Sequence, residues 1–186
     1  MNVGLYLTGV IRALRQQAGW DASFNLTRRG FQQSFVAMAL TLACYYICVL
    51  GLTQFDDAPE AGIEGIAFMP FVLAAGLYAL TFVACAYVFG LLLNCQDRFR
   101  PWVIVRHWAV FFDAFIAGLA FTLFLIGVLP YSMAQWIALA CYLLVLVIDI
   151  QLARVIVGVN IIPAVFIGCI IHTVSLACLF LAVFSI

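Results

Sequence analysis

Five long apolar segments, separated by short polar stretches, set the strongest limit on how this chain can fold. A helix needs about 20 apolar residues to cross the hydrocarbon of a bilayer, and each segment is long enough. Inside the hydrocarbon, a helix satisfies its own backbone hydrogen bonds. We therefore predict an all-α, polytopic membrane protein with a bundle of five transmembrane helices. The segments cover residues 31–53, 66–94, 102–129, 133–156 and 161–185.

The composition agrees with one transmembrane domain, residues 31–186, preceded by a cytoplasmic segment, residues 1–30. Of the 186 residues, 68% are hydrophobic and 9% are charged, which is too little polar surface to cover a soluble domain. The chain has no basic face and no nucleic-acid motif, so we expect no nucleic-acid partner. The expected partners are the lipid bilayer and another membrane protein or further copies of this chain.

The arginines predict the orientation, because cytoplasmic loops carry an excess of basic residues. With five spans, every arginine falls on one side, and the first loop on the other side is acidic. We therefore expect a cytoplasmic N-terminus and a C-terminus across the membrane. Arginine without lysine, beside abundant alanine, is typical of a GC-rich bacterial genome and points to a bacterial inner membrane. The arginines are Arg12, Arg15, Arg28, Arg29, Arg98, Arg100, Arg106 and Arg154, and the acidic residues are Asp56, Asp57, Glu60 and Glu64.

The first 17 residues show the spacing of an amphipathic helix. Apolar side chains recur every three or four residues, while the basic and amide side chains fall elsewhere on the helix. This pattern is typical of a helix lying in the membrane interface. A short cytosolic helix packed on the bundle is an equally good interpretation. The apolar residues are Val3, Leu7, Val10, Ile11 and Leu14, and the polar ones are Arg12, Arg15 and Gln16.

Polar residues interrupt the fourth span, in "VLVIDIQLARVIVGVNIIP". Arg154 lies near the cytoplasmic end, where a long basic side chain reaches the headgroups. Asp149 lies about 7 Å deeper and is rotated by about 140°, so the two do not share a face. Steps of seven residues place Gln135, Tyr142 and Asp149 on one helix face. We predict that Asp149 faces the third span and not lipid, because a charge in lipid is costly.

The third span contains Arg106 and Asp113, again seven residues apart. The tight turn "LPYS" makes the third and fourth spans antiparallel, so we expect Asp113 and Asp149 at similar depth. One interpretation is structural, with the carboxylates neutralised by Arg106 or Arg154, or protonated by burial. The other is a proton or cation site. Small residues beside Asp113, which allow close helix packing, are Ala109, Ala117 and Ala120.

The remaining polar residues of the spans predict helix packing more readily than chemistry. His172 lies about 16 Å into the fifth span, at a different depth from His107. A hydrogen-bonded interior histidine is the expected role, and a haem ligand or proton relay is the alternative. Interhelical hydrogen bonds explain two polar stripes on the first two spans. We expect no cofactor, no metal site and no catalytic residue, because no catalytic motif is present. The stripes are Thr41, Tyr45 and Cys48, and Tyr78, Thr81 and Cys85.

The layout resembles the Yip family of five-span membrane proteins. The stretch "NLTRRGFQQSF" precedes the first span, where that family has an aspartate–leucine–tyrosine–glycine–proline run, which is absent here. The resemblance lies in topology, so no functional residue is carried over. It implies a non-catalytic protein that acts in membrane organisation or as a partner of another membrane complex. The alternative, from the residues, is a small transporter or a proton- or cation-conducting subunit built around Asp113 and Asp149.

Overall fold

The computed structural model describes the backbone of residues 2–54 and 68–184, with the side chains of residues 2–54 and 71–177. The described chain is helical and contains no strand, which agrees with the predicted all-α class. The acidic loop residues Asp56, Asp57, Glu60 and Glu64 lie outside the described residues. The main helices are α1 (Val3–Leu14), α2 (Arg28–Thr53), α3 (Phe68–Leu92), α4 (Phe99–Leu125), α5 (Tyr131–Leu152) and α6 (Ile161–Phe184).

Four of the described helices are long and apolar enough to cross a membrane, judged by length and composition. They are Arg28–Thr53, Phe71–Leu92, Gln96–Leu125 and Tyr131–Val157. The stretch Ile161–Ala177 of α6 is a shorter apolar helix over the part whose side chains are described. The chain is therefore a helical protein with several potential membrane spans. Length and composition alone do not test the prediction of five spans, so that number stays a prediction.

Helix boundaries follow local capping chemistry. α2 begins at Arg28, three residues before the predicted start, because Thr27 accepts a hydrogen bond from the backbone N–H of Gly30. A side chain at position 30 would collide with the backbone carbonyl of Asn25, so only glycine fits there. α5 continues past Leu152 as a π-helical turn, Ala153–Val157, and this turn ends at Gly158, whose φ is 84°.

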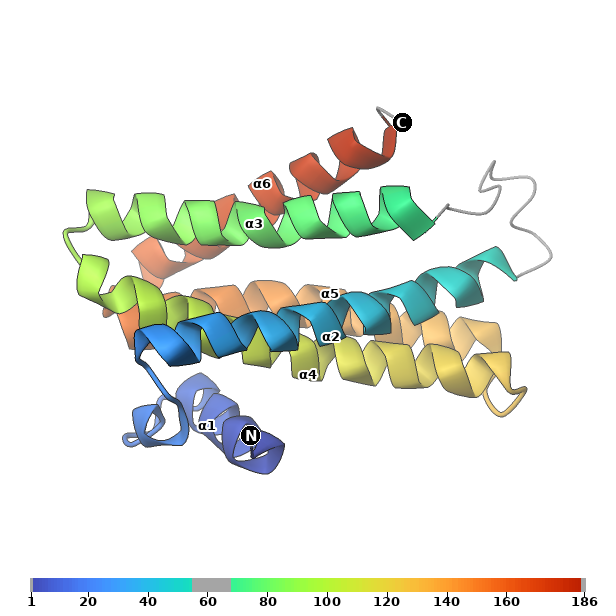
Figure 1. Cartoon of the computed structure of the whole chain (residues 1–186), viewed down its shortest axis with the longest axis horizontal. Helices are drawn as coiled ribbons and strands as arrows, with labels where there is room; N and C mark the ends of the chain where they lie inside the picture. Colours follow the sequence, from blue (N-terminus) through green and yellow to red (C-terminus); the bar gives the residue numbers. More distant parts are fainter. Residues whose placement is uncertain (1, 55–67, 185–186) are drawn as a thin grey trace.

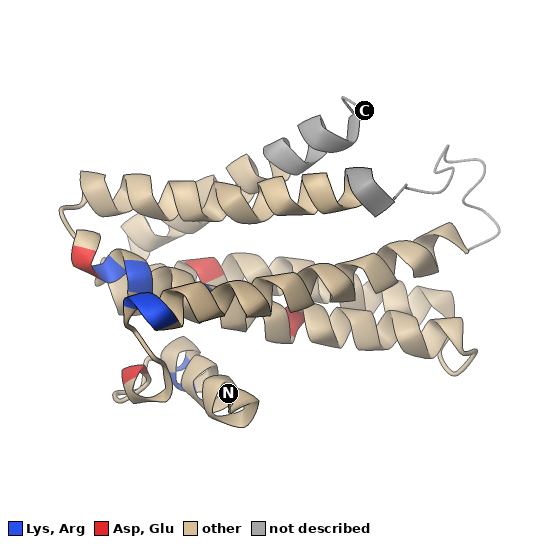
Figure 2. Ribbon diagram, viewed as in Figure 1, with Lys and Arg blue, Asp and Glu red and all other residues tan. Residues whose placement is uncertain are grey.

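The helices form two packed groups rather than an even ring (Figure 1). α2, α4 and α5 lie side by side, and α4 packs on both neighbours. α3 packs mainly on α6, which in turn contacts α5, whereas α3 has few contacts with α2. α1 lies outside the bundle and contacts α4 and α5. Figure 2 shows basic residues gathered at the end of the bundle where α2 and α4 begin, which we name the arginine end.

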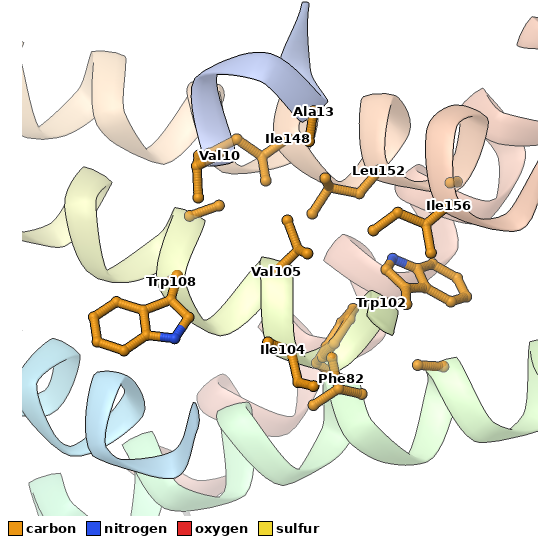
Figure 3. Close-up of a cluster of buried hydrophobic side chains, with 14 of the residues drawn as sticks. Val10, Ala13, Phe82, Trp102, Ile104, Val105, Trp108, Ile148, Leu152 and Ile156 are labelled. Carbon is orange, nitrogen blue, oxygen red and sulfur yellow. The ribbon is translucent and has the colours of Figure 1, made fainter. Parts of the chain in front are cut away.

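The best-packed core lies toward the arginine end, around α4 (Figure 3). Every residue of α4 from 102 to 110 is buried, because α1, α2, α3 and α5 all pack around this segment. Apolar packing in a bilayer comes mainly from close van der Waals contact, since lipid is as apolar as the side chains. The labelled residues of this cluster are Val10, Ala13, Phe82, Trp102, Ile104, Val105, Trp108, Ile148, Leu152 and Ile156.

Two glycines allow close helix contacts. A Cβ placed on Gly118 of α4 would lie 3.2 Å from the Cβ of Cys44 on α2. A Cβ on Gly168 of α6 would lie 3.1 Å from the backbone nitrogen of Ile150 on α5. The two helix pairs therefore meet backbone to backbone at these glycines.

Candidate functional site

Arg106 and Asp149 form an ion pair inside the bundle. Nε of Arg106 donates to Oδ1 of Asp149 at 2.8 Å, and Nη2 donates to Oδ2 at 3.3 Å. The side chains are 3% and 0% exposed. α4 and α5 run antiparallel, which brings these residues together across the helix contact. Asp149 thus faces the third span, as expected, and its charge is matched by a two-nitrogen contact.

A third helix completes the environment of this pair. The guanidinium carbon of Arg106 lies 3.9 Å from the ring centroid of Phe82 on α3, in a cation–π contact. The Tyr78 side chain, one turn earlier on α3, lies close enough to interact with the same guanidinium. Arg106 therefore joins α3, α4 and α5. Phe82 was not predicted from the sequence, because a phenylalanine in an apolar segment carries no signal of its own.

Asp113 does not join this pair, so the expectation of two carboxylates at one depth is wrong. Asp113 lies two turns, or about 10 Å, from Arg106 along α4. Its neighbour on α5 is Cys141, which precedes Asp149 by about 12 Å of helix. In the α4–α5 contact, the residue that lies opposite Asp149 is Arg106 and not Asp113. A proton shared directly between the two carboxylates is inconsistent with this arrangement.

Asp113 is nevertheless enclosed. Its side chain is 3% exposed, and Oδ1 has no hydrogen-bond partner among the described residues. The predicted alanine face surrounds it, because Ala109, Ala117 and Ala120 are all buried. A buried carboxyl oxygen without a partner is costly in an apolar environment. Asp113 is therefore a buried acidic group with one unsatisfied oxygen.

The predicted stripe on α5 does not face the bundle along its whole length. Asp149 is buried, but Tyr142 and Gln135 are exposed. A helix drifts by about 20° for every seven residues, so two such steps rotate Gln135 away from the buried face. Tyr142 instead contacts His172 of α6, with ring centroids 4.8 Å apart. Nδ1 of His172 is buried and has no hydrogen-bond partner among the described residues.

Arg154 lies in the π-helical turn that follows α5. Its Nη1 donates to Oε1 of Gln151 at 3.3 Å, and Nε2 of Gln16, which follows α1, donates to the same oxygen at 2.9 Å. Arg154 forms no ion pair with Asp113 or Asp149 in the described structure. Neutralisation of Asp149 thus comes from Arg106, and Arg154 bonds to the Gln151 oxygen that also accepts from Gln16.

His107 and Ser34 form a buried contact that was not predicted from the sequence. Oγ of Ser34 on α2 lies 3.0 Å from Nδ1 of His107 on α4, and both residues are buried. A signal was present, since Ser34, Thr41 and Cys48 recur every seven residues on one face of the first span. The threonines behave differently from expectation, because Thr41 and Thr81 donate to carbonyls of their own helices.

Two adjacent cavities lie between the helix groups. The larger has a volume of about 270 Å³ and is bounded by α2, α3, α4, α5 and α6. The smaller, of about 30 Å³, lies between α2, α3 and α4 beside Arg106 and His107. Tyr45, Ala75 and Tyr78 line both. Tyr45 and Tyr78, which were expected to bond across helices, thus border both cavities.

The cysteines and histidines do not gather into a metal site in the described part of the chain, where no three His, Cys, Asp or Glu residues are close enough to hold an ion. Cys48 and Cys141 line the larger cavity. None of the described cysteines, Cys44, Cys48, Cys85, Cys95, Cys141 and Cys169, forms a disulfide.

The chain matches no protein-family model, no curated protein and no solved structure.

Proposed function

We propose that this chain is a non-catalytic integral membrane protein that organises the membrane around it, in the manner of the Yip family that it resembles in topology. In this proposal the chain crosses a bacterial inner membrane five times, with α6 as the fifth span. The arginine end and the N-terminus face the cytoplasm. A role as a partner or subunit of another membrane complex belongs to the same proposal, since both use lipid-facing helices rather than catalytic groups.

The observation that carries the proposal is the way α1 is held. Tyr6 stacks on Trp108 of α4, with ring centroids 4.3 Å apart, and Gln16 bonds to Gln151 of α5. Val10 and Ala13 are buried against the bundle. α1 therefore packs on the bundle, and the two interpretations of this segment differ in whether its remaining surface meets lipid or the cytosol.

The same helix leaves an apolar arc exposed beside the bundle. Val3, Leu7 and Ile11 are 43%, 40% and 42% exposed and span an arc of about 80°. Arg12 and Arg15 follow on the next part of the circumference, also exposed. A helix with one face on protein, one apolar face and one basic face fits the boundary between headgroups and hydrocarbon. Fixed to the bundle, α1 would insert into the cytoplasmic leaflet as a shallow wedge.

Vesicles test this role directly. The full chain is reconstituted into phosphatidylglycerol-containing vesicles, and vesicle diameter is measured by electron cryomicroscopy. We expect smaller vesicles or tubules with the wild type, and a loss of this effect in a Val3→Gln, Leu7→Gln, Ile11→Gln variant. Leu5→Gln is the matched control, because Leu5 is exposed on a different side of α1. Identical vesicle shapes with wild type and the triple variant would contradict the proposal.

A second candidate function is proton or cation conduction, which one observation favours. Oδ1 of Asp113 is buried without a partner among the described residues, and its neighbour Cys141 lines the larger cavity. In contrast, Asp149 is fully buried and engaged by Arg106. Conduction therefore predicts ion flux through wild-type vesicles that Asp113→Asn abolishes. The organising role predicts that both proteins leak protons no faster than empty vesicles, measured with a trapped pH-sensitive dye.

A further inference from the structure

A residue that lines the smaller cavity carries an unused hydrogen-bond acceptor. Oγ of Ser34 lies 2.7 Å from the carbonyl oxygen of Phe31, to which it donates its single hydrogen. The contact between Ser34 and His107 then requires Nδ1 of His107 to be the donor. The other ring nitrogen, Nε2, carries a lone pair in the neutral ring. Nε2 is buried and has no partner among the described residues, while His107 is 3% exposed and lines the cavity.

Residues with hydrogen-bond donors line the same region. The phenolic side chains of Tyr45 and Tyr78 line both cavities. Arg106 also lines the smaller cavity, but its charge is already matched by Asp149. An anionic group added there would leave an unpaired charge in an apolar environment. A hydroxyl suits this end best, because it donates to Nε2 of His107 and accepts from a phenol.

The larger cavity suits an apolar body. Its lining is almost entirely aliphatic, aromatic or sulfur-bearing and comes from five helices. An engineered apolar cavity of about 150 Å³ stays dry and binds benzene. The volume here, about 270 Å³, therefore has room for a larger hydrocarbon. Besides the two tyrosines, the lining residues that give the cavity this character include Cys48, Phe71, Ala138, Cys141 and Leu176.

We propose that the two cavities form one binding site for a neutral, mainly apolar alcohol taken from the bilayer. The hydroxyl lies against His107, Tyr45 and Tyr78, and the hydrocarbon chain fills the space between α2, α3, α5 and α6. Long-chain and isoprenoid alcohols have this chemistry. The site is independent of the proposed role of α1, because none of its lining residues belongs to α1.

Photolabelling tests the site with the full chain in phosphatidylcholine nanodiscs. The probe is 1-decanol bearing a diazirine, and the labelled peptides are identified by mass spectrometry. We expect adducts on α3, α5 and α6 segments that line the cavity. Unlabelled 1-decanol should compete about tenfold better than decane or decanoate, the difference that one satisfied buried hydrogen bond makes. Equal competition by decane, or better competition by decanoate, would overturn the proposal without any variant.

Two variants locate the ends of the site. Ala138→Phe fills the larger cavity and should abolish the adducts, whereas Ala140→Phe, the same change at an exposed position of α5, should leave them. His107→Asn keeps a donor toward Ser34 but lacks Nε2, so decanol should lose its advantage over decane. Unchanged labelling in folded Ala138→Phe, or an unchanged alcohol preference in folded His107→Asn, would contradict the assignment. Folding is checked by the melting temperature of each variant in the same nanodiscs.

Discussion

Arg106 of α4 donates through two nitrogens to Asp149 of α5, which lies 43 positions further along the chain. Both side chains are almost completely buried. A pair of this kind is expensive to desolvate, so its contribution to stability becomes evident only when one partner is removed and the other charge stays buried alone. It also opposes a change in the α4–α5 register, because a shift of either helix would strand a charge among apolar side chains.

Asp149→Asn tests this pair. The change keeps the shape but leaves the guanidinium of Arg106 buried without a counter-charge, so unfolding in detergent should become easier by about 3 kcal/mol. The double variant Arg106→Met, Asp149→Leu removes both charges and should recover most of that loss. Chemical unfolding followed by circular dichroism measures both. A double variant no more stable than Asp149→Asn would show that the pair contributes more than mutual neutralisation.

Asp113 should respond differently to the same substitution. Its Oδ1 has no hydrogen-bond partner in the described structure, so Asp113→Asn strands no cation. We expect a change in the free energy of unfolding of less than about 1 kcal/mol, well below that of Asp149→Asn. The comparison uses the same unfolding assay and needs no assumption about transport. Equal destabilisation by both variants would mean that Asp113 has an essential partner in the membrane.

These two aspartates also show how far the sequence could predict the site. The turn "LPYS" implied antiparallel helices, and a buried charge needs a partner, so a contact between Asp149 and the third span was predictable. The depth of Asp113 was not, because helix register depends on side-chain packing as well as on turn position. Along α5, about two helical turns separate Cys141, which lies beside Asp113, from Asp149, which was expected there.

Other features depend on packing that no local pattern records. The apolar segments predicted the positions of α2 to α6 to within a few residues, because hydrophobic length is a local property. The cavity beside Tyr45 and Tyr78 arises from the relative positions of five helices, so those polar positions were assigned to interhelical hydrogen bonding instead. His107 was judged by depth alone, and its partner Ser34 was overlooked.

Gly30 should tolerate no side chain. A Cβ there would collide with the carbonyl group of Asn25, which belongs to the turn that leads into α2. We expect Gly30→Ala to lower the free energy of unfolding by about 2 kcal/mol, within the usual range for a backbone clash. Gly76→Ala is the matched control, since a Cβ at that helical position meets nothing. The control should be neutral or stabilising by up to about 1 kcal/mol. Equal melting temperatures would contradict the close approach at Gly30.

Cys95 reports the orientation of the bundle. It lies between α3 and α4, at the arginine end, and is half-buried. If that end is cytoplasmic, a membrane-impermeant maleimide should label Cys95 in inverted vesicles but not in intact cells. Cys95→Ser provides the background from the remaining cysteines. Labelling of the wild type in intact cells, above that background, would reverse the proposed orientation.

The pH dependence of this labelling reflects the surroundings of the thiol. Burial, helped by the charge of Asp97, raises the pKa of Cys95, and Arg98 acts in the opposite direction. The thiolate is the reactive form, so below this raised pKa the labelling rate should increase about tenfold per pH unit. We therefore expect slow labelling near neutral pH and a continuing rise at least to about pH 9, without a plateau. A rate that levels off near neutral pH would mean that the pKa lies below that of a free thiol, so that the positive charge of Arg98 outweighs burial and Asp97.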